Sequence, residues 1–441
     1  MNLMNRLDFR TTPLDRRTLR SSVPRVSVDI SDAVAAVGPL ITDVRERGRT
    51  AVLEYTRRFD QVELESVRVP AEALGRSLAE LDPNIRASLE ESIARARRVA
   101  AADRREPSTT EFDGDGTVTT RWLPVDRVGL YVPGGLAVYP STVVMNVVPA
   151  QEAGVPSLAI ASPPQSDGLP HPTVLAAAAL LGVEEVWAMG GAQAIAALAY
   201  GFDDGEDLEP VDLITGPGNA YVAAAKATVR SVVGIDSVAG PTEIIILADD
   251  TADPGFVAAD LISQAEHDPL AAAVLVTDSE QLATAVESQL AVQVPAAEHA
   301  ERITEALSGQ QSGIILVADL DAGVAVLNAY AGEHVELLVR NPEAVVDRVT
   351  SGGSIFLGSH SPVALGDYCS GSNHVLPTMG TASHASALGV QSFLKGSQII
   401  DYPPEALHKV ADHIISLANE EALPAHGAAV AMRFGTEEGV R

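Results

Sequence analysis

The chain has little of several features that mark whole classes of protein. It contains one cysteine, Cys369, among 441 residues, which excludes an intrachain disulfide and fits a reducing, cytoplasmic compartment. No run of about 18 apolar residues occurs, so no transmembrane span is expected. The basic N-terminal segment lacks the apolar centre and the small-residue cleavage site of a secretory signal. We therefore expect a cytoplasmic protein without a membrane partner.

Positive charge is also scarce. The chain has 30 Lys and Arg against 59 Asp and Glu, a formal net charge of −29. This balance argues against a nucleic-acid partner or an anionic membrane surface. An anionic cofactor would need local help from helix N-termini and backbone amides. The length allows two or three domains, and the 46% hydrophobic content supports a sizeable core.

Strand-like and helix-like segments alternate along most of the chain, which is typical of the α/β class. A first block predicts strands at 127–132, 157–161, 185–189 and 211–214, with helices at 141–153, 174–181, 192–200 and 220–233. A second block predicts strands at 243–248, 272–277, 314–318, 335–339 and 354–357, with a helix over 254–266. This repeated pattern with glycines at the turns predicts doubly wound parallel sheets.

The two ends of this α/β region read differently. Residues 25–130 begin helical and charged, and residues 107–116 read as a loop or the approach to a hairpin. A tail follows from about residue 386, with a helix over 404–421. The tail has too little apolar material to fold alone, so we expect it to dock on the rest of the protein or on another subunit.

Four segments near the C-terminus hold polar residues that a solvated surface would not need. Nine of the ten histidines lie from His267 to His426. Small or apolar residues border most of the segments, so we expect their polar groups to point into a shared pocket. They are Gln264-Ala-Glu-His267, Gly332-Glu333-His334, Gly366 to His374, and Glu421 to His426. Neutral imidazoles, a carboxylate and an amide oxygen can hold a divalent metal, and a Glu beside a His can supply two bases.

Each segment also has a plainer structural explanation. Gln264 and His267 are three apart on a helix and share a face, but a histidine is also favoured there by the helix dipole. Neighbours on a strand, such as Glu333 and His334, point to opposite faces unless a bulge or strand start redirects them. Cys369 has no basic neighbour to activate it, which disfavours a nucleophilic thiol.

The fingerprint G-x-G-x-x-G is missing, but three glycine turns follow strands and precede helices. They are Tyr131-Val-Pro-Gly-Gly135, Gly190-Gly-Ala-Gln193 and Gly216-Pro-Gly-Asn219. Each offers close backbone approach and free amides to a phosphate. Together they indicate a nucleotide cofactor.

Long motifs make the chain resemble the histidinol dehydrogenase family from about Leu7 to Arg433. They are YVPGG, GGAQAIAALAYG, GPGNAYV, AGPTEIIILAD, ADLISQAEHDP, GEHVEL, GDYCSGSNHVLPT and the E-x-x-x-x-H tail. The resemblance implies two Rossmann-like doubly wound domains, similar to aldehyde dehydrogenases, with small N- and C-terminal extensions. It implies oxidation of L-histidinol through L-histidinal to L-histidine, with two NAD, one Zn²⁺ per active site, and a homodimer with shared active sites.

The resemblance also implies roles for individual residues. Glu333 and His334 correspond to the catalytic bases. The metal ligands are implied to be Gln264, His267, Asp367 and His426. The substrate contacts are Thr242, His374 and Glu421, together with His334 and the four metal ligands. Tyr131, Gln193 and Asn219 correspond to cofactor contacts. In the family, Glu421 and His426 come from the partner subunit's tail.

The implied domains are an N-terminal arm over 1–25, a metal-bearing and catalytic domain over 26–130 and 243–385, an NAD-binding domain over 131–242, and the tail over 386–441. Two other readings of the polar residues stay open from the residue types alone. A zinc hydrolase or aldolase would use the same ligands with Glu333 activating water, but it would not need the glycine turns. A non-catalytic ligand-binding α/β protein would not need a Glu-His pair beside four ligands.

Overall fold

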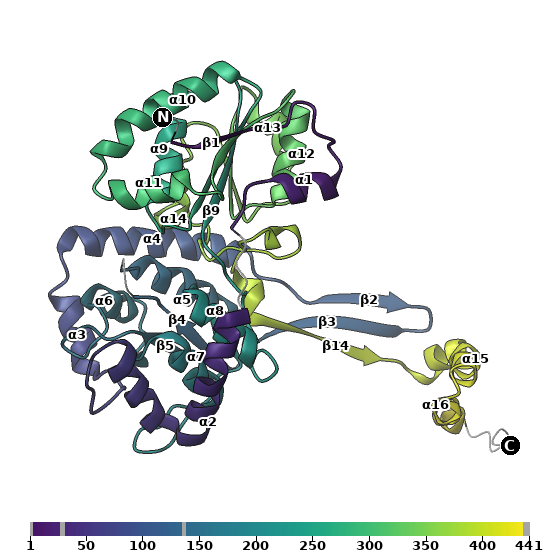
Figure 1. Cartoon of the computed structure of the whole chain (residues 1–441). Helices are drawn as coiled ribbons and strands as arrows, with labels where there is room; N and C mark the ends of the chain where they lie inside the picture. Colours follow the sequence, from purple (N-terminus) through teal and green to yellow (C-terminus); the bar gives the residue numbers. More distant parts are fainter. Residues whose placement is uncertain (1–2, 27–30, 135–137, 435–441) are drawn as a thin grey trace. The chain divides into compact units, whose positions relative to one another are not determined.

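The computed structural model describes residues 3–26, 31–134 and 138–434. The chain divides into two compact units. Unit 1 comprises Met1–Asp103 and Asp126–Phe393, and unit 2 comprises Arg104–Val125 and Leu394–Arg441. Unit 1 holds two parallel sheets, each flanked by helices (Figure 1), which confirms the predicted α/β class. Within the described ranges, every helix is too short or too polar to span a bilayer.

The first sheet of unit 1 has six parallel strands in the order β1-β11-β10-β9-β12-β13. Their bounds are Asn5–Asp8 (β1), Glu243–Ala248 (β9), Ala272–Thr277 (β10), Gly313–Leu316 (β11), His334–Leu338 (β12) and Ser354–Leu357 (β13). One face packs on α9 (Pro254–Ala265), α10 (Glu280–Gln293) and α11 (Ala300–Ser308). The other packs on α1 (Arg16–Ser22), α12 (Leu320–Tyr330) and α13 (Pro342–Val346).

Alternation along the strands divides the apolar side chains between these two cores. In β9, Ile244 and Ile246 belong to the α9 face, while Ile245 and Leu247 belong to the α12 face. A strand that is buried on both faces needs a continuous apolar run, as the sequence of β9 has. Unit 1 also contains the short helix α14 (Val363–Tyr368), which follows β13. It has 3₁₀ turns at Val294–Ala296, Thr381–Ser383 and Val390–Phe393.

The second sheet has five parallel strands in the order β6-β5-β4-β7-β8. They are Arg127–Tyr131 (β4), Ser157–Ser162 (β5), Val186–Ala188 (β6), Leu213–Thr215 (β7) and Gly234–Ile235 (β8). Helices α2 (Ser31–Phe59), α7 (Gly191–Tyr200) and α8 (Ala220–Val229) share one apolar core with this sheet. Helix α5 (Pro140–Ala153) contacts β4 and packs with α4 (Pro83–Ala102) and α6 (Pro172–Leu180), and α3 (Ala71–Ala79) packs on α6.

Most predicted elements of the two blocks are confirmed within a few residues. The strand expected at 127–132 is β4, and the helix expected at 141–153 is α5. The helix expected at 220–233 ends earlier, at Val229. The next residues turn because the chain must return to the sheet, where Gly234 pairs beside Leu213. Because Val232 and Val233 are also apolar, the end of the helix at Val229 could not be predicted from the sequence.

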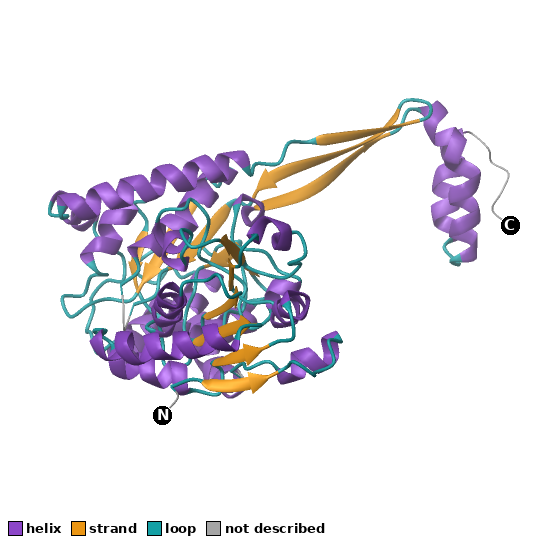
Figure 2. Cartoon of the chain, turned by 90° about the horizontal axis from the view of Figure 1, so that it is seen from above, coloured by secondary structure: helices purple, strands orange, loops and turns teal. Residues whose placement is uncertain are grey.

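Unit 2 is built on a three-stranded antiparallel sheet in the order β14-β3-β2 (Figure 2). The strands are Ser108–Phe112 (β2), Gly116–Pro124 (β3) and Leu394–Asp401 (β14). Helices α15 (Pro404–Glu420) and α16 (Pro424–Ala431) follow, and a 3₁₀ turn spans Met432–Phe434. Large apolar side chains in this unit face outward, with Ile400 70% and Met432 81% exposed. Residues 107–116, expected as a loop or the approach to a hairpin, contain β2 and the turn of the hairpin that β2 forms with β3.

Candidate active site

A cluster of polar side chains lies where β9 and β12 begin. The two strands are parallel neighbours that pair Ile244 with His334. Thr242 and Glu333 precede these strands directly, so their side chains reach the same edge. Helix α9 returns antiparallel to the strands and brings its last turn, with Gln264, to this edge as well. The cluster thus sits at the amino ends of the strands, whereas sites in open α/β sheets typically gather at the carboxyl ends.

A chain of hydrogen bonds fixes the carboxylate of Glu333, the first of the two predicted bases. Gln264 Nε2 donates to Thr242 Oγ1 at 2.6 Å, and Thr242 Oγ1 donates to Glu333 Oε2 at 2.6 Å. The backbone N–H of Glu243 donates to the same Glu333 oxygen at 2.9 Å. Gln264 Oε1 is buried and has no hydrogen-bond partner among the described residues. A buried amide oxygen without a donor is costly, so this atom is prepared for a ligand.

Three imidazoles of the cluster are held in the same tautomer. In each ring Nδ1 faces a main-chain carbonyl, which only accepts, so Nδ1 carries the hydrogen and Nε2 the lone pair. The contacts are His267 Nδ1 to Ser263 O at 3.0 Å, His334 Nδ1 to Glu243 O at 3.2 Å, and His374 Nδ1 to Asp367 O at 3.1 Å. Metal-ligating and proton-accepting histidines usually have this second contact.

Asp367, in the last turn of helix α14, also belongs to the cluster. Its Oδ1 lies 4.0 Å from His334 Nε2, while His334 Nδ1 lies 3.7 Å from Glu333 Oε2. His374 Nε2 lies 3.2 Å from Thr142 Oγ1, so the hydroxyl donates to the ring. Burial lowers the pKa of His334 and of His374, although the Asp367 charge opposes this effect. Both rings are therefore neutral bases near pH 7.

Burial acts on the carboxyl group of Glu333 in the opposite direction. It raises the pKa of Glu333 to about 7, although the bonds from Thr242 and from the Glu243 N–H favour the ionised form. Glu333 can therefore accept and release a proton near neutral pH. Glu243, which the sequence reasoning missed, also has its pKa raised to about 7 by burial, and its carboxylate lies 3.4 Å from Arg25. The position of Glu243 at the start of the otherwise apolar strand β9 could have indicated a functional residue.

Unit 1 brings together seven of the nine residues predicted for metal, base and substrate roles. These are Thr242, Gln264, His267, Glu333, His334, Asp367 and His374. Glu421 follows α15 and His426 lies in α16, both exposed side chains of unit 2. In the described part of the chain, no three His, Cys, Asp or Glu residues converge as a metal site. The metal ligands predicted within unit 1 comprise two residues of these types, His267 and Asp367, and the amide of Gln264.

The three predicted cofactor residues lie at the carboxyl ends of strands in the five-stranded sheet. Tyr131 ends β4, and its hydroxyl accepts from the Gly191 N–H at 3.1 Å. Gln193 is buried, and its Nε2 lies 3.5 Å from Asp60 Oδ2. Burial raises the pKa of Asp60 to about 6, and sequence reasoning missed this residue. Asn219 is exposed and caps α8. Gly135 of the first glycine turn lies outside the described residues.

The turn that leads to Asn219 requires a glycine. Gly216 has φ +116°, and a side chain there would collide with the carbonyl of Tyr131. Lys226 and Asp236 hold both main-chain groups of this glycine. Lys226 Nζ donates to Gly216 O at 2.9 Å, and the Gly216 N–H donates to Asp236 Oδ2 at 2.8 Å. Lys226 and Asp236 also form a buried ion pair.

Breaking that ion pair will destabilise the protein. We expect Lys226→Met to lower the free energy of unfolding by about 3–5 kcal/mol, because it leaves the Asp236 carboxylate buried without its cation. Urea denaturation measures the loss. The exposed Lys409→Met is the matched control, and an equal, small effect in both variants would contradict this account.

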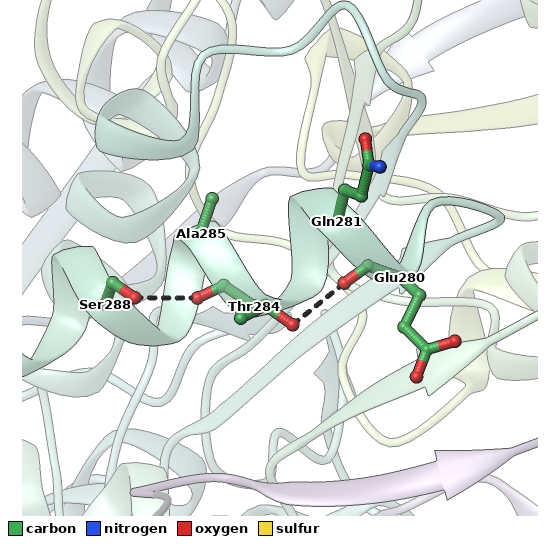
Figure 3. Close-up of a pocket in the computed structure, with 5 residues that line it drawn as sticks. All are labelled: Glu280, Gln281, Thr284, Ala285 and Ser288. Carbon is green, nitrogen blue, oxygen red and sulfur yellow. Dashed lines mark hydrogen bonds between the residues drawn. The ribbon is translucent and has the colours of Figure 1, made fainter.

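A separate hollow of about 650 Å³ lies against helix α10 (Figure 3). It is lined by Glu280, Gln281, Thr284, Ala285 and Ser288. The hydroxyl groups of Thr284 and Ser288 donate to carbonyls one turn earlier in their own helix, at 3.0 and 2.9 Å. The hollow contains none of the predicted site residues. The residues predicted as catalytic bases lie instead in the cluster at β9 and β12.

The chain is similar to known proteins over nearly its whole length. The family model described as histidinol dehydrogenase matches residues 23–434. Histidinol dehydrogenase of Thermobifida fusca is 60% identical over 439 residues, 99% of both chains, and that of Nocardia farcinica is 60% identical over 433 residues, 97% of both. The crystal structure of histidinol dehydrogenase from Elizabethkingia anophelis superposes with a TM-score of 0.93 at 32% identity, covering 99% of each chain. This chain belongs to the histidinol dehydrogenase family.

Proposed function

We propose that the chain oxidises L-histidinol to L-histidine through L-histidinal, using two NAD, in the last steps of histidine biosynthesis. The family match supports the reaction class and the substrate. One observation supports the placement of the chemistry: Glu333 and His334 are two buried bases beside the unpartnered amide oxygen of Gln264. The zinc hydrolase and the non-catalytic binding protein lose their support, because neither accounts for the family match.

The residues present fit a zinc ion. Gln264 Oε1 is buried without a donor, and the Nδ1 contacts of His267 leave its Nε2 lone pair for a metal. Asp367 adds a carboxylate, and we propose the partner's His426 as the fourth ligand. Nitrogen and oxygen donors of this kind suit Zn²⁺. Zinc bound there would hold and orient the imidazole and amine of the substrate.

His334 is suited to take the proton of the alcohol. Its Nε2 carries the lone pair, and burial keeps the ring neutral. When Nε2 accepts the hydroxyl proton, the Glu243 carbonyl already holds Nδ1–H and stabilises the cationic ring. NAD, when bound, would supply the acceptor for the carbon-bound hydrogen, which leaves as hydride. The product of this half-reaction is the aldehyde.

Glu333 is suited to the second half-reaction, in which water must add to the aldehyde. Its pKa of about 7 lets Oε1 or Oε2 accept a proton from water near neutral pH. Thr242 and the Glu243 N–H fix one oxygen and so orient the other. Loss of the remaining carbon-bound hydrogen of the hydrate, as hydride to a second NAD, would give the carboxylate. General-base assistance of this kind typically contributes about 10²–10⁴ in rate.

The remaining predicted residues complete the two binding sites. We propose His374 and the partner's Glu421 as substrate contacts, with Thr242 positioning Glu333. Tyr131, Gln193 and Asn219 are the proposed NAD contacts. The N-termini of α7 and α8 follow the glycine turns, so the positive end of each helix dipole would favour a pyrophosphate there.

The stoichiometry of NAD reduction tests the proposed function. We expect two NADH per L-histidinol, and loss of both after zinc is removed with a chelator and their return when zinc is restored. A protein that forms no NADH from L-histidinol in the presence of zinc would contradict the proposal.

Subunit mixing tests whether the active site is shared. We expect His334→Asn and His426→Asn each to abolish activity alone, because each removes one part of every site. In mixed dimers one of the two sites regains an intact His334 and an intact tail. Random mixing should therefore restore about a quarter of wild-type activity. A mixture that stays inactive, although mass spectrometry shows mixed dimers, would contradict a shared site.

A further inference from the structure

Two carboxyl groups lie outside the residues used above, each on an element that carries the site. Glu336 is in β12, two residues after His334, and Asp260 is in α9, one turn before Gln264. Alternate residues of a strand share a face. Val335 and Leu337 belong to the α12 core, so Glu336 points with His334 and Leu338 to the face covered by α9. Glu336 is only 1% exposed.

The two carboxyl groups are joined by a hydrogen bond. Glu336 Oε2 is buried with no N–H or hydroxyl donor among the described residues, and a side-chain hydrogen bond links Glu336 to Asp260. Two ionised carboxylates cannot make this bond, so one of them keeps a proton. Burial, and then the charge of Asp260, raises the pKa of Glu336 well above its usual value, whereas burial raises the pKa of Asp260 to about 6. Glu336 therefore donates and Asp260 accepts.

Glu336 also reaches a third element of the site. Its Oε1 accepts from the Val363 N–H at 3.1 Å, at the start of α14. Asp367 lies one turn later in the same helix. The interactions that act on Glu336 are burial, Asp260 and the Val363 N–H, without a cation. The pair thus joins α9, β12 and α14. Gln264 lies in α9 and His267 just after it, His334 begins β12, and Asp367 lies in α14.

Packing alone does not explain a carboxyl pair at this place. Apolar side chains of the same volume would avoid the cost of desolvating the pair, and every other residue of β12 after His334 is apolar. Hydrogen bonds give what apolar contacts do not, namely a fixed direction and spacing between the joined elements. We propose that Asp260 and Glu336 share one proton and act as a positioning pair, which sets the spacing of α9, β12 and α14 and so the geometry of the zinc ligands; the proposal rests on the zinc site of the proposed function.

Zinc affinity separates a positioning role from simple packing. Asp260→Ala removes the acceptor and unties α9, so we expect the zinc dissociation constant to rise by about 10- to 100-fold, as for other partners that orient metal ligands. Asp260→Asn keeps a side-chain hydrogen bond to Glu336 and should bind zinc within a few-fold of wild type. Asp347→Ala, which removes an exposed carboxylate, is the control. Equal affinity of the Ala and Asn variants would overturn the proposal.

Infrared spectroscopy tests the shared proton by a measurement other than zinc affinity. The difference spectrum between the wild-type holoenzyme and Glu336→Gln, recorded at the pH of the activity assay, should contain one carbonyl band of a protonated carboxyl group, because a hydrogen bond between two carboxyl groups requires one of them to keep its proton. In Asp260→Asn this band should disappear at a lower pH than in wild type, because the neighbouring negative charge is gone. A wild-type spectrum without the band overturns the proposal.

The two measurements also separate this proposal from the zinc site itself. A wild-type protein that binds no zinc in the titration would contradict the proposed function. The infrared band would then still establish or refute the shared proton. A band together with equal zinc affinity in all variants would leave the proposed function intact and overturn the positioning role.

Discussion

Glu333→Gln is expected to slow oxidation of the aldehyde by about 10²–10⁴-fold while slowing oxidation of the alcohol far less. The amide keeps the size of the side chain and accepts the bonds from Thr242 and the Glu243 N–H, but it cannot take a proton from water. His334, the proposed acceptor of the alcohol proton, is unchanged. Stopped-flow measurement of the first and second NADH, started from L-histidinol and from L-histidinal, gives the two rates separately.

The exposed Glu298→Gln is the matched control and should leave both rates at wild-type values. Equal slowing of the two half-reactions in Glu333→Gln would show that the two bases do not divide the work. In that case the adjacent His334 and Glu333, 3.7 Å apart, would have to act as one unit.

His267→Asn is expected to give a protein that folds but no longer retains zinc. The substitution removes the Nε2 donor, while the helix end and the buried amide of Gln264 stay in place. Loss of a partner that only orients a metal ligand costs about 10- to 100-fold in affinity, so loss of the ligand itself should cost more than about 100-fold. Metal analysis after dialysis measures zinc per chain, and circular dichroism checks the fold.

His299→Asn provides the control, because His299 is exposed before α11 and its side chain makes no cap hydrogen bond. It should retain zinc at the wild-type stoichiometry. One zinc per chain in dialysed His267→Asn would remove His267 from the ligand set and leave it as a substrate contact alone.

Local spacing made much of the cluster predictable. Gln264 and His267 are three apart near the end of a helix, and the structure places both at its last turn or just after it. The expectation of opposite faces for Glu333 and His334 does not apply, because β12 begins at His334 and Glu333 precedes it. Both side chains therefore reach the same edge. The roles assigned to these residues remain predictions.

Contacts between elements that are distant in the sequence could not be predicted from local spacing. Glu243 meets Glu333 because β9 and β12 are neighbours, and Asp260 meets Glu336 because α9 covers that face of the sheet. Both glutamates interrupt apolar strands, which is a visible but unspecific signal. The sheet of unit 2 was missed because β14 joins β3 from a distant part of the chain, with most of its side chains exposed and no apolar alternation to mark it.

Asn219 carries a restriction on how it can recognise a ligand. Its Oδ1 already accepts from the backbone N–H groups of Tyr221 and Val222, at 3.0 and 3.1 Å. Only Nδ2 is left for a ligand. The side chain can therefore donate a hydrogen bond to an acceptor, such as a ribose oxygen, and cannot accept one from a ligand donor. An aspartate would complete the same helix start equally well yet present no donor, which makes position 219 a place where recognition can be switched off while the scaffold is kept.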